Sequence, residues 1–168
     1  MEFIRKKIRL PAAQYLGRKQ YFLTLACEQR RAFFGSLRVV GWVIDELKDQ
    51  VGSSRFLLHA WTIMPDHLHV LLEGSDGECD LLRFVTQFKG RTAKRVRIAL
   101  DLRLWQSRFY DHILRPTDSF YGVAAYIWMN PVRKGICKRP EEYPGSGSLT
   151  LQWKQYVLTY PGWHPPWK

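Results

Sequence analysis

The pattern of apolar and polar residues predicts four strands and three helices. Short apolar runs between polar or turn residues are typical of strands, and apolar residues at helical spacing, such as Leu37, Val40 and Leu47, are typical of a helix. The predicted strands cover residues 20–29, 56–64, 67–73 and 108–114, and the predicted helices cover 33–50, 79–100 and a third segment that ends near Asn130. Thr117 or Asp118 can cap this third helix, and Pro131 limits it.

The order of these elements predicts the fold. Strand, helix, hairpin, helix and strand, with Pro65 and Asp66 as the turn pair, is the order of an α+β, ferredoxin-like split βαβ core, an antiparallel sheet backed by helices. The third helix is an addition to this core. We expect residues 1–137 to form a single domain with a basic N-terminal arm, and residues 138–168, rich in Pro, Gly and Trp, to form an irregular C-terminal tail docked on the domain.

The charge of the chain indicates the class of partner. It carries 26 Lys and Arg against 15 Asp and Glu, a formal net charge of +11, so polyanions should be attracted to it. Seven Trp, eight Tyr and nine Phe add rings on which unstacked bases of single-stranded nucleic acid can lie, although core positions account for such residues equally well. Nucleic acid is therefore the partner we expect.

The cysteines and the absence of long apolar runs indicate the compartment. Cys27, Cys79 and Cys137 are odd in number and form no C-x-x-C motif, which argues against a disulfide framework and against a cysteine zinc site. No apolar run approaches the ~20 residues that span a bilayer. We expect a cytoplasmic protein with no membrane partner.

Two histidines stand out in "MPDHLHVLLE" at residues 64–73. Because side chains alternate along a strand, His67 and His69 point to one face while Leu68 and Val70 point to the other, into a core. A rigid strand thus offers two imidazole ligands to a divalent metal. An isolated H-x-H is more often an ordinary half-buried pair, so a third ligand is needed to favour a metal site.

The third helix offers that ligand. Tyr126 and Asn130 are four residues apart and therefore share one helix face. If this helix packs over the histidine face, an amide oxygen beside two nitrogens suits Mg²⁺ or Mn²⁺ with positions open for a phosphate, and the Tyr126 phenol can act as a nucleophile. The alternative is that Tyr126 belongs to the core and Asn130 caps the helix before proline.

Basic residues gather in two places. We expect the cations of the second helix to contact DNA phosphates, since no acidic residue lies among them: Lys89, Arg91, Lys94, Arg95 and Arg97. A second cluster, which can reach a groove of a nucleic acid, lies in the N-terminal arm: Arg5, Lys6, Lys7 and Arg9. A solvated helix face and a disordered arm are the alternatives. Of the remaining histidines, His112 is expected to bond a backbone group.

Three blocks resemble one family. "MPDHLHVLLE", "WQSRFYDHILR" at 105–115, and "YIWMNPVRKGI" at 126–136 followed by "EEYPGSGS" resemble the REP-associated tyrosine transposases, in the single-tyrosine branch of the HUH endonuclease superfamily. The resemblance extends from about Leu10 to Ser148. It implies that residues 1–137 are an HUH-type catalytic domain in which His67 and His69 bind the metal and Tyr126 is the nucleophile. Asn130 falls on the third ligand, which is Gln in many insertion-sequence relatives.

The resemblance also implies a reaction: metal-dependent cleavage and strand transfer of single-stranded DNA at palindromic hairpins through a covalent 5′-phosphotyrosine link and a free 3′-OH. It leaves monomer and homodimer open, and no general base is assigned among Asp66, Glu73 and Asp111. A domesticated protein that binds hairpin DNA without useful cleavage is one alternative. A histidine-triad nucleotide hydrolase is another, but Leu71 occupies the position of its third histidine.

Overall fold

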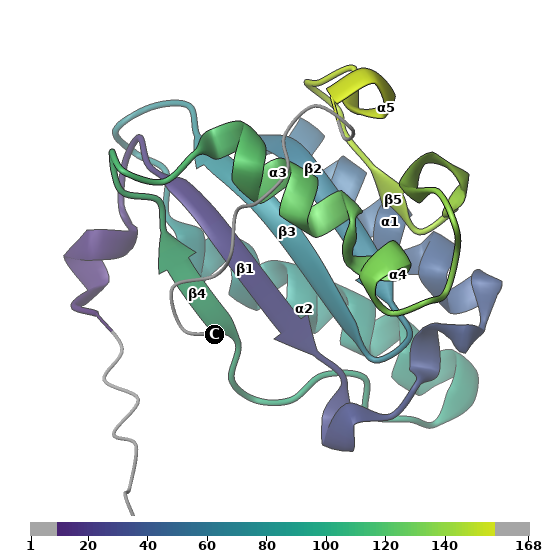
Figure 1. Cartoon of the computed structure of the whole chain (residues 1–168). Coiled ribbons are helices and arrows are strands. Elements are labelled where there is room, and N and C mark those ends of the chain that lie inside the picture. The colour runs from purple at the N-terminus through teal and green to yellow at the C-terminus, as the bar shows by residue number, and fades with distance from the viewer. Residues whose placement is uncertain (1–9, 157–168) are drawn as a thin grey trace, which may run out of the picture.

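One antiparallel sheet organises the chain. The computed structural model describes residues 10–156, and its strands are β1 (Gln20–Ala26), β2 (Phe56–Met64), β3 (His67–Gly74), β4 (Tyr110–Ile113) and β5 (Ser146–Gly147). They lie in the order β4-β1-β3-β2-β5, and every neighbouring pair is antiparallel. The predicted α+β, ferredoxin-like arrangement is confirmed, with β5 added at the edge beside β2 (Figure 1).

Helices cover both faces of this sheet. The α-helices are α1 (Leu37–Gly52), α2 (Leu81–Leu100), α3 (Phe120–Trp128), α4 (Asn130–Arg133) and α5 (Trp153–Tyr156). Short 3-10 turns are η1 (Ala12–Tyr15), η2 (Glu28–Arg30), η3 (Phe33–Gly35) and η4 (Pro140–Glu142). In Figure 1, α1 and α2 lie behind the sheet and α3 crosses its front. None of the helices within residues 10–156 combines the length and apolarity needed to cross a membrane.

Side chains alternate along β3 and pack into two separate cores, one on each face of the sheet. Leu68, Val70 and Leu72 are buried in the larger core, beneath α1 and α2. Leu71 is buried in the smaller core, beneath α3, together with Phe22 of β1. His67 and His69 have the same parity as Leu71 and so lie on the α3 face. The predicted orientation of both histidines is therefore confirmed.

The start and the end of the third helix differ from the sequence prediction. Ser119, rather than Thr117 or Asp118, is the N-cap of α3, and its hydroxyl accepts a hydrogen bond from the Gly122 amide at 3.0 Å. The Asp118 carboxylate instead accepts from the Arg115 amide at 2.7 Å.

Pro131 does not end helical structure. It lies in the first turn of α4, directly after a bend at Met129, where a missing backbone N–H costs nothing. The bend separates α3 from α4 and sets the direction of the residues that follow Tyr126.

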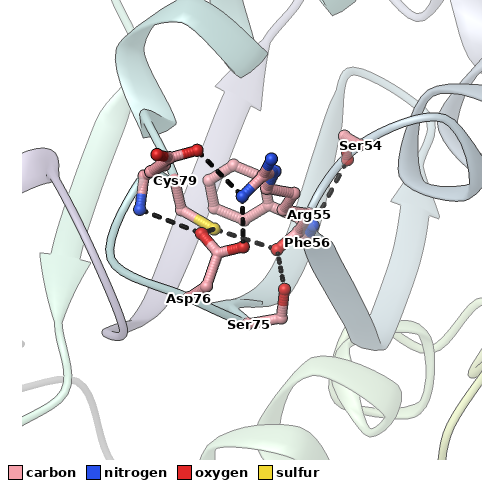
Figure 2. A network of polar contacts seen from close by, with 7 residues as sticks. Ser54, Arg55, Phe56, Ser75, Asp76 and Cys79 are labelled. Carbon is pink, nitrogen blue, oxygen red and sulfur yellow. Dashed lines mark hydrogen bonds and ion pairs between the residues drawn. The ribbon is translucent and has the colours of Figure 1, made fainter.

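A polar network fixes the end of the β2–β3 hairpin that lies farthest from the histidines. The Arg55 guanidinium pairs with the Asp76 carboxylate (Figure 2), at 2.8 Å. It also pairs with the Glu78 carboxylate, at 2.9 Å. The Ser75 hydroxyl and the Cys79 thiol both donate to the Arg55 carbonyl (Figure 2). This network ties the loop before α2 to the start of β2. All three cysteines are free thiols.

The segment after Lys138 packs on the domain as far as it is described. Trp128 Nε1 donates to the Gly147 carbonyl at 2.9 Å, and Tyr143 Oη donates to the Ile63 carbonyl at 2.6 Å. The ring centres of Trp128 and Trp153 are 5.4 Å apart. These contacts hold β5 against β2 and close the smaller core. Residues 157–168 of the predicted tail lie outside the described residues.

Candidate active site

The two imidazoles of β3 converge on one point. His67 Nε2 and His69 Nε2 lie 3.0 Å apart on the face that α3 covers. Two nitrogens that bind one divalent ion at about 2.1 Å and at right angles to each other are also about 3.0 Å apart. The pair therefore has the spacing of two neighbouring ligands of a single ion, and the nitrogens suit such an ion chemically.

Each histidine is oriented through its other ring nitrogen. His67 Nδ1 lies 2.5 Å from Asp66 Oδ1, and His69 Nδ1 lies 2.8 Å from Thr24 Oγ1 on the neighbouring strand β1. A carboxylate on Nδ1 keeps the proton there and leaves Nε2 as an electron-pair donor. The Thr24 hydroxyl can donate or accept, so it accommodates either tautomer of His69. Both Nε2 atoms can thus face an ion at the same time.

Burial keeps the pair neutral. It lowers the pKa of His67 although Asp66 acts in the opposite direction. It lowers the pKa of His69 well below the ordinary value, and the charges of His67, Arg133 and Arg30 add to this effect. Neutral imidazole is the form that binds metal ions.

Helix α3 brings Tyr126 over this pair. The helix is apolar on all sides, with the small residues Ala124 and Ala125 among its buried positions, and can therefore lie close to the sheet. The Tyr126 ring centre is 6.0 Å from that of Phe22 and 6.3 Å from that of His69. The predicted packing of the third helix on the histidine face is confirmed.

Asn130 lies one turn further on, at the start of α4. Its amide Nδ2 donates to the Tyr126 carbonyl at 3.1 Å, and the side chain is buried. The Nδ2 atom of the amide thus caps the last turn of α3, whereas metal binding would use the amide oxygen. The two roles predicted for Asn130, helix cap and metal ligand, therefore involve different atoms. Within residues 10–156, no group of three His, Cys, Asp or Glu side chains is placed to hold a metal, so a third protein ligand would be of another type.

The sequence interpretation missed three cations beside the histidines. The Arg133 guanidinium carbon lies 4.1 Å above the centre of the Tyr126 ring, and Arg30 Nη1 lies 3.4 Å from Asp66 Oδ2. The charge of Lys134 acts on His67. The sequence did contain a signal for Arg133, because it lies seven residues, or two helical turns, after Tyr126 and so falls close to the same helix face. Nothing in the sequence relates Arg30 to β3.

The predicted DNA-binding residues of α2 lie apart from the histidine pair, because α2 covers the opposite face of the sheet. Lys89 Nζ donates to the carbonyls of Gln106 and Ser107, at 2.6 and 3.0 Å. Arg91 pairs with Glu46 of α1 at 3.2 Å, and Arg95 lies over the Trp42 ring. Lys94 and Arg97 complete this set on the same helix. The arm residues Arg5, Lys6, Lys7 and Arg9 lie outside the described residues.

The three acidic candidates for a general base have structural partners. Asp66 binds His67; Glu73 accepts from Gln20 at 2.8 Å and lies 3.0 Å from His59 Nε2; and Asp111 accepts from the Tyr15 hydroxyl at 2.8 Å. Asp111 also lies on the face opposite the histidines, since it pairs with Leu23 of β1.

His112 binds a carboxylate, and the expected bond to a backbone group stays a prediction. Its Nε2 lies 2.9 Å from Asp118 Oδ2, in the turn that precedes α3. A carboxylate that the turn already orients toward β4 is a stronger partner for an imidazole than a carbonyl. This contact joins β4 to the start of α3.

The lowered pKa values of the histidine pair predict how stability depends on pH. The unfolded chain protonates its histidines below about pH 6.5, whereas the folded protein resists protonation of His67 and His69. The unfolded state therefore binds more protons, and the free energy of unfolding should fall as the pH drops from 7 to 5, by up to about 1.4 kcal/mol per pH unit for each histidine. Urea unfolding with a chelator present measures this slope. His69→Gln should reduce it, and an unchanged slope would contradict the assignment.

Comparison with known proteins identifies the family of this chain. Residues 17–127 match the family model described as "Transposase IS200 like", a range that includes His67, His69 and Tyr126 and ends before Asn130. The REP-associated tyrosine transposase of Escherichia coli K12 is 30% identical over 92 residues, which are 54% of this chain and 53% of that protein. This chain thus spans about half the length of that relative.

Two further proteins are similar over a larger share of the chain. An uncharacterised protein of Haemophilus influenzae is 25% identical over 159 residues, covering 76% of this chain and 88% of that protein. The solved structure of a REP-associated tyrosine transposase bound to a REP hairpin has the same fold, with a TM-score of 0.70 at 23% identity over 84% of this chain and 81% of that one. Since the family model matches more than half of its residues, this chain belongs to the IS200-like transposase family.

Proposed function

We propose that this protein is a metal-dependent endonuclease and strand transferase that acts on single-stranded DNA at palindromic hairpins through a covalent 5′-phosphotyrosine intermediate. The observation that carries the proposal is the meeting of three side chains on one face of the sheet. His67 and His69 direct their Nε2 atoms at one point, and Tyr126 packs against His69 from the helix above. A two-nitrogen ligand set beside a phenol is suited to nucleophilic attack on a phosphodiester.

His67, His69 and the Asn130 amide oxygen would hold the ion, which we expect to be Mg²⁺ or Mn²⁺. Bound there, it would act as a Lewis acid that polarises the scissile phosphate. Asp66 and Thr24 fix the two rings in advance, so the protein loses little freedom when the site is loaded.

Tyr126 would form the bond to DNA. Its phenolic oxygen attacks phosphorus, the bond from phosphorus to the 3′ oxygen breaks, and that oxygen takes up one proton as the phenol loses one. The 5′ phosphate stays on the tyrosine, and the free 3′-OH can reverse the step. Phe22 and Arg133 contact the ring, and Asn130 and Arg133 both donate to the Tyr126 carbonyl, so the nucleophile is held at its ring and at its backbone.

The proposed substrate follows from charge and from the relatives. A net charge of +11 favours a polyanion, and one protein with this fold is described as bound to a REP hairpin. A protein that binds hairpins without cleaving them is the alternative that the following experiment separates.

The covalent step is tested with hairpin DNA that carries a single-stranded flank, taken from palindromes beside the gene. With Mn²⁺, the wild-type protein should form a protease-sensitive adduct and release a 3′-OH strand. Tyr126→Phe should abolish the adduct, and His67→Ala with His69→Ala should abolish cleavage, while hairpin affinity changes only a few fold because the ion contacts one phosphate among many.

Tyr121→Phe serves as the matched control, since Tyr121 is exposed on the same helix and should leave the adduct unchanged. An adduct that forms without Tyr126 would disprove the nucleophile assignment. Hairpin binding with no adduct in any form of the protein would favour the binding-only alternative.

The role of Asn130 is tested by its response to metal concentration. Asn130→Ala removes one of three proposed protein ligands and should raise the Mn²⁺ concentration needed for half-maximal cleavage by about 10–100-fold, with the rate partly restored at high Mn²⁺. Isothermal titration with Mn²⁺ measures the affinity directly. A rate defect that Mn²⁺ does not change would assign Asn130 to helix capping alone.

The basic surface of α2 remains a proposed contact with DNA away from the reacting phosphate. Replacing Arg91, Lys94 and Arg95 together with Gln should weaken binding to every sequence and reduce the log-log slope of affinity against salt by roughly one unit for each phosphate that the protein no longer neutralises. The single-turnover rate at saturating DNA should not change, because α2 lies across the sheet from the histidines. An unchanged salt slope would make this surface an ordinary solvated helix face.

A further inference from the structure

Two arginines flank the histidine pair from the two sides of β3. Arg30 follows β1 through the turn η2 and lies 3.4 Å from the Asp66 carboxylate that orients His67. Arg133 belongs to α4, which packs over β2, and lies 4.1 Å above the Tyr126 ring centre. The strands β1 and β2 are the two neighbours of β3, and the charges of both guanidinium groups act on His69.

Both guanidinium groups have donors to offer a ligand. Arginine has five N–H donors, and Arg133 uses Nη2 to bind the Tyr126 carbonyl at 2.6 Å. Among the described residues, no carboxylate forms an ion pair with Arg133. The Arg30 side chain is 56% exposed, and its ion pair with Asp66 is long. Guanidinium groups with donors to spare beside a buried neutral pair form a site for a phosphate.

The backbone holds Arg30 in this place at a conformational cost. Gln29 and Arg30 both have left-handed backbone angles, with φ of 52° and 56°, which residues other than glycine rarely adopt. The hydrogen bonds from the Cys27 amide to the Asp66 carbonyl, and from the Glu28 amide to the Leu104 carbonyl, fix the start of this turn. Strain of this kind persists only where surrounding contacts impose it, and it is concentrated at functional sites.

We infer that Arg30 and Arg133 bind the non-bridging oxygens of the scissile phosphodiester, one from each side of the histidine pair. The inference rests on the proposed function and adds two phosphate-binding residues to it. Negative charge builds on these oxygens during attack, so donors fixed beside them stabilise the transition state more than the bound substrate. Arg133 in addition positions the Tyr126 ring. The cations of α2 belong to a helix that packs on the other face of the sheet.

Single-turnover cleavage at saturating hairpin DNA and Mn²⁺ tests the inference. Arg30→Ala and Arg133→Ala should each lower the rate by about 10²-fold, the usual effect of removing one fixed donor, while the dissociation constant for DNA changes much less. Arg31→Ala is the matched control, since Arg31 is an exposed neighbour of Arg30 with the same charge, and its rate should be that of the wild type. Rates unchanged in both test variants would overturn the inference.

Two substitutions at Arg133 separate phosphate binding from ring packing. Arg133→Met keeps an apolar stem over Tyr126 without donors, and Arg133→Lys keeps the charge without the planar fork. We expect Arg133→Met to be as slow as Arg133→Ala, and Arg133→Lys to recover only part of the rate. A wild-type rate in Arg133→Met would reduce Arg133 to a packing role and overturn the inference. Thermal unfolding of each variant confirms that it is folded.

A second measurement does not depend on cleavage. In ¹H–¹⁵N spectra of the arginine Nε–H groups, tetrathymidylate with Mg²⁺ should shift the signals of Arg30 and Arg133 and leave that of Arg31 in place. If the signals shift but the wild-type protein forms no adduct with hairpin DNA and Mn²⁺, the phosphate site is supported and the proposed function is disproved. An adduct with unshifted signals would disprove this inference alone.

Discussion

The pairing of β1 with β3 is the interaction on which the candidate site depends. It places Thr24 opposite His69 and Ala26 opposite His67, so that a hydroxyl of one strand orients an imidazole of the other. A slip of one residue would turn both histidines into the core beneath α1 and α2. Burial of Leu68 and Val70 in that core fixes the register, and the stability of the fold thereby fixes the geometry of the site.

Each ring nitrogen of the histidine pair has a partner within the protein. His67 Nδ1 is bound to Asp66, His69 Nδ1 is bound to Thr24, and the two Nε2 atoms face each other. Buried polar groups need such partners, and here the contact between the two Nε2 atoms is the one that an ion would replace. Burial also lowers the pKa of both rings and so favours their neutral form.

A sheet covered on both faces allows its two sides to serve different purposes. The core between the sheet and α1 and α2 contains most of the large buried side chains and provides the bulk of the stability. The smaller core holds α3 against Phe22 and Leu71, and so sets the distance between Tyr126 and the histidines. The helix that carries the α2 cations and the helix that carries Tyr126 consequently lie on opposite faces of the sheet.

The sequence by itself determined the four strands of the core, its three main helices, their order and the face on which the histidines lie, because strand alternation and helical periodicity are local properties of the chain. It also put Tyr126 and Asn130 on one helix face. Only the tertiary structure decided what meets across distant elements: Thr24 with His69, Arg30 with Asp66, and α2 on the far face of the sheet. Ser119 replaced Thr117 and Asp118 as the helix cap for the same reason, since Asp118 was already bound within its turn and to His112. Contacts of this kind depend on which faces pack together, and neither residue spacing nor composition contains that information.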